Sequence, residues 1–386
     1  MTTIAAPARE DEIADAIADA ARGEERLAIT GGGSKAGFGA PAEARTLAMT
    51  GLTGVVDYDP AELVLTVRPG TPLADVEALI GGENQMLAFD PFDHGPLYGL
   101  PAGRATIGGV VAAGVAGSQR ISAGGARDHL LGFRAVSGRG EVFIAGGKVV
   151  KNVTGYDLPK LAAGSWGRLF VMTELTLKVL PRPSVVATRL IEGLDAAGAV
   201  KAMAIAMGSQ ADIGAAAHLP KNGHERSLTA FRIQGFGPSV AARCAMLETL
   251  LAPVGAVETP DETAAARIWA DLRSLAPLGP DRALWRINVA PSKGSDIVAA
   301  LRPLGADWMM DWAGGLIWAA LGDPAAQAIR AAAEKAGGHA ALVRGSRAQR
   351  ASIPAFHPPA PGLAALETRV RRAFDPMGVF ETGRFA

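Results

Sequence analysis

Two glycine-rich segments contain the residues best suited to binding a bulky polar ligand. The first, residues 31–35 (GGGSK), directly follows the short apolar run 27–29. The second begins with TIGG at 106–109 and continues to AGS at 116–118. Glycine lets backbone N–H groups approach a ligand with no Cβ in the way, and successive N–H groups form a concavity that binds anions. Two separated loops of this kind predict a dinucleotide held extended across the protein.

A Rossmann-type site is the first alternative, and the spacing of the glycines argues against it. Gly31, Gly33 and Gly37 give G-x-G-x-x-x-G instead of G-x-G-x-x-G. No clear acidic residue ends a following strand about 20 positions later, as that fingerprint requires. The second alternative, an ordinary turn between a strand and a helix, stays open for the first loop taken alone.

A third polar segment, residues 151–157 (KNVTGYD), lies between two apolar runs. Lys151 offers a cation for a phosphate or a substrate carboxylate, and Tyr156 is one of only three tyrosines. Asp157 has a simpler interpretation as the N-cap of a helix that begins at Leu158-Pro159. Among the histidines, His94 precedes the second glycine segment and is the one we expect near the ligand.

The remaining histidines give no metal site. His218 and His224 are six positions apart in a segment with glycine and lysine, which is not a recognised ligand spacing, and we expect both to be solvated. We therefore predict no metal.

The pattern of apolar residues predicts an α+β protein. An acidic amphipathic helix over 11–22 precedes short strands at 27–29, 47–49, 54–56 and 63–67, and Thr71 and Pro72 start a further helix as N-cap and first residue. After Pro183, strands at 227–234, 282–290 and 316–321 alternate with helices at 239–251, 297–304 and 324–337, which predicts an antiparallel sheet covered by helices. A proline-rich linker (347–361) and an amphipathic helix (363–374) follow, and a turn then returns the tail to the N-terminal part.

Composition limits the partners. The chain has 386 residues, with 38 basic and 38 acidic side chains, so it has no net charge to attract nucleic acid or an anionic membrane. A single cysteine, Cys244, excludes a disulfide framework and an iron–sulfur cluster ligated by this chain. No run reaches 18 uninterrupted apolar residues, and the N-terminus has no signal-peptide pattern. We expect a cytoplasmic protein that contacts the inner membrane only through partners.

Several of these motifs together resemble a known family. The segments 31–35, 106–109, 127–132 (RDHLLG), 151–158 (KNVTGYDL) and 164–174 are similar to the FAD-binding domain of the vanillyl-alcohol-oxidase/p-cresol-methylhydroxylase type. Within it they resemble the FAD-binding E subunits of bacterial glycolate oxidase (glycolate dehydrogenase). The resemblance covers about residues 25–183 and returns at 374–380. It implies a two-part FAD-binding domain at 1–182 (subdomains about 1–56 and 57–182), a cap domain at 183–350, and a C-terminal linker, helix and tail at 351–386.

The same resemblance implies the ligand and the residues that hold it. Relatives that attach FAD covalently use a histidine in the first loop, where this chain has GGGSK, so we predict non-covalent FAD. The residues implied to bind it are Gly31, Gly32, Gly33, Ser34, Lys35, Thr106, Ile107, Gly108, Gly109, Gly117, Ser118 and Val171.

The implied activity is oxidation of glycolate, a 2-hydroxy acid, to glyoxylate, beside a larger FAD-containing subunit and an iron–sulfur subunit. That chemistry needs a proton acceptor and a cation for the carboxylate, and Lys151, Tyr156 and His94 are the candidates, with Arg384 as a further cation. Two alternatives stay open: a flavin-loaded structural or electron-transfer subunit without its own substrate site, and a stand-alone FAD oxidase of another 2-hydroxy acid or alcohol.

Overall fold

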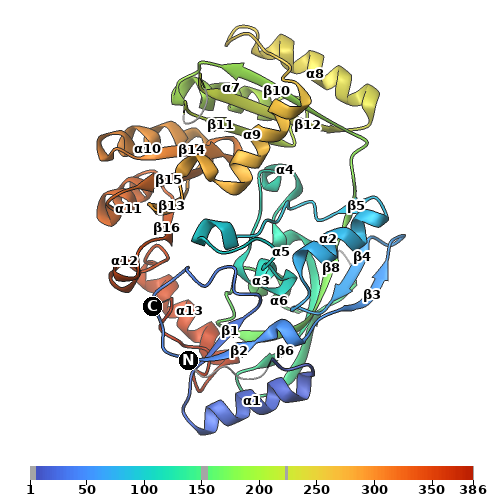
Figure 1. Cartoon of the computed structure of the whole chain (residues 1–386), viewed down its shortest axis with the longest axis vertical. Coiled ribbons are helices and arrows are strands. Elements are labelled where there is room, and N and C mark those ends of the chain that lie inside the picture. The colour runs from blue at the N-terminus through green and yellow to red at the C-terminus, as the bar shows by residue number, and fades with distance from the viewer. Residues whose placement is uncertain (1–5, 149–154, 222–224, 386) are drawn as a thin grey trace.

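The computed structural model describes residues 6–148, 155–221 and 225–385 (Figure 1). An N-terminal part is built around a five-stranded sheet, and a separate seven-stranded sheet with its helices stands above it in Figure 1. The described C-terminal tail returns to the N-terminal part (Figure 1). Within the described residues, no helix has the length and apolar character needed to cross a membrane.

The five-stranded sheet has the order β3-β4-β8-β6-β7, and every neighbouring pair is antiparallel. Side chains alternate along its central strand. Phe170 and Met172 belong to the main core, whereas Val171 packs on the opposite face. The strands are β3 (Val55–Asp59), β4 (Val64–Val67), β6 (Leu130–Ser137), β7 (Val142–Gly146) and β8 (Phe170–Lys178).

A small cluster joins the two ends of the chain on that opposite face. Helix α1 (Glu10–Arg22) buries Ile13 and Ile17, which recur at helical spacing, against Val171 and the parallel pair β1 (Leu27–Thr30) and β2 (Arg45–Ala48). Val379 and Phe380, near the C-terminus, complete this cluster. The N–H of Leu27 donates to the carbonyl of Val379 at 2.8 Å, so the tail is fixed beside the first strand.

Short helices pack on the core face of the five-stranded sheet. The helix expected after Thr71 is present, but Pro72 is its N-cap, not Thr71. The Thr71 hydroxyl instead donates to the carbonyl of Arg68 at 2.7 Å and stabilises the preceding turn. These helices and the adjoining strand pair are α2 (Leu73–Gly82), α3 (Ile107–Ala113), α4 (Arg120–Ala123), α5 (Ala126–His129), α6 (Leu158–Ala162), β5 (Gln85–Met86) and β9 (Leu180–Pro181).

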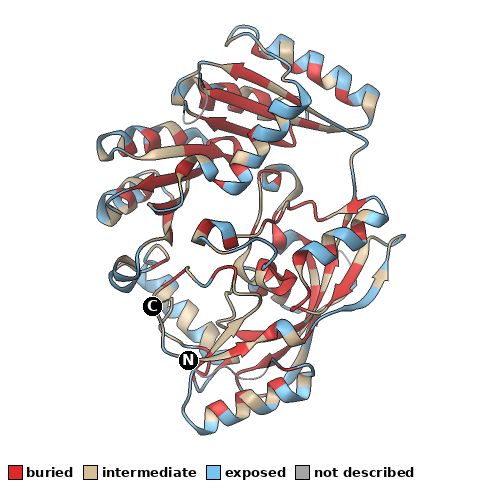
Figure 2. Cartoon of the chain, viewed as in Figure 1, coloured by how far each residue is buried: buried red, intermediate tan, exposed pale blue. Residues whose placement is uncertain are grey.

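The seven-stranded sheet is antiparallel throughout, in the order β10-β12-β11-β14-β15-β13-β16. The antiparallel sheet covered by helices that the sequence predicts is thus confirmed. Both sheets carry their buried residues along the central strands (Figure 2). The strands are β10 (Val185–Glu192), β11 (Ala215–Leu219), β12 (Leu228–Gly235), β13 (Ala283–Asn288), β14 (Asp307–Asp311), β15 (Leu316–Leu321) and β16 (His339–Arg344).

The two faces of this sheet pack on different partners. On β13, Trp285 and Ile287 pack among helices, whereas Leu284 belongs to the core shared with the N-terminal part. The helices on the first face are α7 (Ala196–Met207), α8 (Gly237–Leu251), α10 (Gly294–Leu301) and α11 (Ala326–Lys335). Helix α9 (Glu262–Ser274) contributes Ile268 and Leu272 to the shared core.

Two sequence-based expectations in the C-terminal half are wrong. The segment expected to be only a linker contains helix α12 (Arg347–Ser352), and α13 (Pro361–Phe374) then follows. His218, expected in a solvated loop, lies on β11 with 1% of its surface exposed. Its Nδ1 is 2.9 Å from the hydroxyl of Thr229, which satisfies the buried ring. His224 lies outside the described residues.

Candidate cofactor-binding site

The first glycine loop follows β1 and lies against the segment that leads into α3. A Cβ on Gly31 would lie 2.2 Å from Oγ1 of Thr106, and a Cβ on Gly32 would lie 1.8 Å from the carbonyl oxygen of Arg104. Gly33 has a φ of +75°, a conformation that side chains disfavour. Close packing therefore requires glycine at these positions, and their backbone lies open on the other side.

The second segment presents the N-terminal end of α3 to the same space. Thr106 is the N-cap, and its Oγ1 accepts a hydrogen bond from the N–H of Gly109 at 3.3 Å. A Cβ on Gly108 would lie 2.5 Å from the ring of Pro69, so this turn of the helix also needs glycine. Ile107 is fully buried and anchors the helix in the core.

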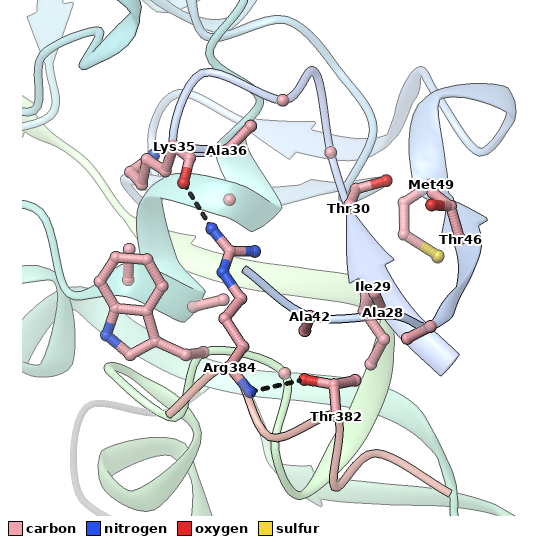
Figure 3. Close-up of a pocket in the computed structure, with 18 of the residues that line it drawn as sticks. Ala28, Ile29, Thr30, Lys35, Ala36, Ala42, Thr46, Met49, Thr382 and Arg384 are labelled. Atoms are coloured by element: carbon pink, nitrogen blue, oxygen red, sulfur yellow. Dashed lines mark hydrogen bonds between the residues drawn. The ribbon is translucent and has the colours of Figure 1, made fainter. Parts of the chain in front are cut away.

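Both glycine segments line one cavity of about 1330 Å³ (Figure 3). That volume exceeds the roughly 300–1,000 Å³ of sites for drug-sized ligands, so it can hold a larger molecule such as a dinucleotide. Phe170 and Met172 of β8 contribute side chains to the wall, as does Trp166. Thr382 and Arg384 close the cavity from the C-terminal tail.

The loop end of the cavity carries unbalanced positive charge. Lys35 is only 8% exposed, and its Nζ has Ser34 Oγ as a partner at 3.5 Å. Burial lowers the pKa of Lys35 to about 8, partly offset by the charge of Asp93, so the amine is mostly protonated at neutral pH. In the described part of the chain, no carboxylate lies within ion-pair distance of the Lys35 amine. A buried cation of this kind stabilises a bound anion.

Arginines hold the first glycine loop and the residues that follow it, 36–39, through backbone carbonyl groups. Arg384 donates to the carbonyls of Phe38 and Lys35 at 2.8 and 2.5 Å (Figure 3 draws the bond to Lys35). Arg104 donates to the carbonyl of Gly32 at 3.0 Å, and Arg350 donates to that of Gly39 at 2.9 Å. Across the described ranges, none of these three arginines forms an ion pair with a carboxylate. Their charges therefore add to the positive potential of this wall.

Most of the expected cofactor residues converge on this cavity. Those that line it are Gly31, Gly32, Gly33, Ser34, Lys35, Thr106, Gly108 and Gly109. Ile107 and Val171 are buried beside it, the latter between the wall residues Phe170 and Met172. The assignment of each to a bound cofactor stays a prediction.

Gly117 and Ser118 lie elsewhere, at the contact between the N-terminal part and the seven-stranded sheet. The carbonyl of Gly117 accepts from the indole N–H of Trp312 at 3.0 Å. The hydroxyl of Ser118 donates to Oδ2 of Asp311 at 2.7 Å, and both side chains are buried. Burial raises the pKa of Asp311 to about 6.

The three proton-transfer candidates are not brought together among the described residues. Lys151 lies outside them, and Tyr156 is 89% exposed. His94 stacks on Phe92 with ring centroids 4.4 Å apart, and its Nδ1 is buried without a hydrogen-bond partner. Burial, with the charges of Lys35 and Arg286, lowers the pKa of His94 well below its usual value, so the ring is neutral.

Sequence reasoning missed several residues that shape the site. Trp166 lies within the glycine-rich 163–167 motif, so its position was a usable signal, and it stacks on Phe38 at 4.3 Å. Arg104 and Arg350 act through backbone carbonyls far away in sequence, and Asp311 meets Ser118 across 193 positions. Nothing local in the sequence marks these three.

Comparisons with known proteins agree with this geometry. A family model described as "FAD binding domain" matches residues 2–146. The glycolate oxidase subunit GlcE of Escherichia coli is 34% identical over 380 residues, covering 97% of this chain and 95% of that protein. The glycolate oxidase subunit GlcD of Bacillus subtilis is 31% identical over 145 residues, which cover 37% of this chain and 29% of the GlcD chain. A solved structure of p-cresol methylhydroxylase with substrate bound has a TM-score of 0.73 at 14% identity, over 99% of this chain and 88% of that one, and shares the fold.

Proposed function

Because the chain belongs to the GlcE family of FAD-binding oxidoreductases, with the p-cresol-methylhydroxylase-type fold, we propose that it is the E-type subunit of a glycolate oxidase. In this role it contributes to the oxidation of glycolate to glyoxylate, and electrons pass to a partner subunit. The observation that carries the proposal is the end-to-end match to GlcE of E. coli, combined with a glycine-lined cavity at the matching loops. We also infer that residues 1–182 are the cofactor domain, 183–350 a cap, and 351–386 a returning tail.

The residues of the cavity fit FAD. The positions of Gly31 and Gly32 are closed to any Cβ by neighbouring atoms, so their backbone is the surface that a ligand meets. The buried ammonium of Lys35 has no carboxylate partner among the described residues, so it suits the diphosphate, whose phosphate oxygens would balance its charge. The first loop has no histidine, which supports non-covalent binding.

Bound FAD would accept two electrons and the hydrogen from the α-carbon of the hydroxy acid. This chain must then hold the acid and take up its hydroxyl proton. The neutral His94, with a free Nδ1, is the proton acceptor that we propose. Tyr156 is too exposed to share that task unless a partner subunit covers it.

A larger flavin subunit and an iron–sulfur subunit complete the proposed complex. The partial match to GlcD of B. subtilis, a second glycolate oxidase subunit, supports a partner with a similar cofactor domain. The single Cys244 means that an iron–sulfur relay would have to be on another chain.

One observation favours a second candidate, a flavin-loaded electron-transfer subunit without its own substrate site. Among the described residues, no histidine lines the cavity, and this includes His94. This candidate predicts normal FAD binding with no response to glycolate.

The experiment is the anaerobic visible spectrum of the purified chain, before and after addition of glycolate, alone and with its partner subunits. Flavin bands that bleach in the isolated chain would support a complete substrate site here. Bleaching only in the assembled complex would support the electron-transfer candidate. If neither preparation responds while another 2-hydroxy acid does bleach the flavin, glycolate is the wrong substrate.

A further inference from the structure

One face of the seven-stranded sheet presents an unneutralised arginine to the N-terminal part. On β13, Trp285 and Ile287 pack among the helices and Leu284 packs in the shared core, so Arg286 lies on the shared face by strand alternation. Its guanidinium Cζ is 5.0 Å from the ring centroid of Trp312. In the part of the chain that the structure describes, Arg286 makes no hydrogen bond and no ion pair.

A second arginine approaches the same indole from the N-terminal part. Arg120 is exposed, and its Cζ lies 4.4 Å from the Trp312 ring centroid. Burial, with the positive charge of Arg120, lowers the pKa of Arg286 to about 10, so it remains a cation at neutral pH. Two like charges beside one ring repel each other, and an anion would relieve that repulsion.

Arg232 on the same face has a different charge environment. It lies over Trp269 at 4.2 Å, and the charges of Asp90 and Asp311 raise its pKa against the effect of burial, although its Nε is buried without a hydrogen-bond partner among the described residues. Within the described residues no acidic group acts on Arg286 in this way, and the charge of Arg120 repels it. Arg286 is therefore a position where an anion would be stabilised.

This position is connected to the cofactor cavity through Trp312. The indole N–H of Trp312 donates to the carbonyl of Gly117 at 3.0 Å, four positions after Ala113, which lines the cavity. The charges of Lys35, another lining residue, and of Arg286 both lower the pKa of His94. Among the described residues, the buried Nδ1 of His94 has no hydrogen-bond partner.

We propose that Arg286 binds the carboxylate of a small 2-hydroxy acid where β13 meets the turn Trp312–Gly314. This inference rests on the proposed function and names the residue that holds the substrate. The planar guanidinium can donate two parallel hydrogen bonds to a carboxylate, and its stacking on Trp312 fixes the plane of that fork. Arg120, exposed beside it, would draw the anion in from solvent.

The test is calorimetric titration of the full-length, FAD-loaded chain with oxalate, an unreactive small carboxylate. Arg286→Met keeps an apolar stem over Trp312 but removes the fork, and we expect oxalate binding weaker by roughly 10- to 100-fold. Arg282→Met is the matched control. Arg282 lies just before β13 and already pairs with Asp307, so its loss should change the affinity by no more than about threefold through screened charge.

Equal oxalate affinity in Arg286→Met and Arg282→Met, at equal FAD content, would overturn the inference, as would wild type that does not bind oxalate. If Arg286→Met does not fold, Arg286→Lys replaces it, and an affinity equal to wild type would again overturn the inference, since lysine cannot form the bidentate fork. Glycolate-dependent bleaching is scored separately. If glycolate bleaches the flavin but Arg286→Met binds oxalate as tightly as wild type, only this inference is refuted. If glycolate bleaches no flavin in the full complex, the proposed function is refuted.

Discussion

Replacement of Arg384 by Met should weaken FAD binding although the residue lies in the C-terminal tail. Its partly buried guanidinium lies in the cavity wall and donates to the carbonyls of Lys35, in the first glycine loop, and of Phe38, three residues later. A hydrogen bond from a charged group contributes about 1.5–3 kcal/mol, so the two bonds together hold the loop with at least about 3 kcal/mol. Arg104 and Arg350 also hold this segment through the carbonyls of Gly32 and Gly39. The loss of Arg384 therefore reduces the free energy that keeps the loop ordered by only part of this amount.

The effect on affinity follows from the population of the ordered loop. If the loss of Arg384 costs about 1.4–2.8 kcal/mol of loop order, the binding-competent fraction falls and the apparent Kd rises roughly 10- to 100-fold. Loss of a cation from the wall acts in the same direction, because the diphosphate is an anion.

The assay is titration of the FAD-free chain with FAD, followed by flavin fluorescence anisotropy. Arg372→Met is the matched control, since Arg372 is an exposed cation of α13 whose loss removes the same charge from the same C-terminal segment. Circular dichroism establishes that both variants are folded. A Kd for Arg384→Met within about threefold of the Arg372→Met value would refute the reasoning, because the tail would then not hold the loop.

Three further predictions concern stability. Gly32→Ala should lower the free energy of unfolding by about 1–3 kcal/mol, because the new Cβ would lie 1.8 Å from the carbonyl oxygen of Arg104. Gly82→Ala is the control and should leave the free energy of unfolding unchanged, because a Cβ there would meet open space. Chemical denaturation measures the free energy of unfolding of both variants. Burial raises the pKa of Asp311 to about 6 in the folded state, whereas its pKa in the unfolded state is roughly 4. At a pH between these two values, the folded state holds a proton that the unfolded state has lost. Stability should therefore fall as pH rises through that window, by on the order of 3 kcal/mol, and urea unfolding of Asp311→Asn should lack this slope; an unchanged slope would contradict the assignment. His218 has the opposite sign: burial lowers its pKa to about 4, so stability should fall as pH drops from roughly 6.5 to 4. In the same urea assay His218→Gln should lose this dependence, and an unchanged dependence would contradict the prediction.

Local constraints were readable from the sequence. Gly31, Gly32 and Gly108 are required because neighbouring atoms exclude a Cβ, and Gly33 because its φ is +75°. Such glycine runs stand out in any sequence. Strand β15 and helices α8 and α13 were predictable because their apolar pattern is strong over whole elements. The antiparallel sheet was predicted from this apolar pattern, whereas the FAD-binding fold was predicted from the resemblance of the glycine-rich motifs to a known family.

Contacts between distant elements could not be predicted. Strand β11 reads AAAHL, and alanine is compatible with strand, helix or loop, so nothing indicated that His218 is buried in the middle of a sheet. The prolines after residue 353 concealed the short helix α12 that precedes them. The positions of Arg286 and Asp311 depend on how two separate sheets meet, and a single sequence does not encode that arrangement in any local pattern.

The wall that Arg384 completes has a consequence for how the protein is made. Arg384 follows Lys35 by 349 positions, so at a synthesis rate of about 5–20 residues per second the glycine loop waits roughly 20–70 s for its C-terminal support. Leu27 likewise lacks its partner Val379 during that time. The nascent chain therefore exposes an unfinished cavity, and we expect stable uptake of FAD only after the segment that contains Arg384 has been made.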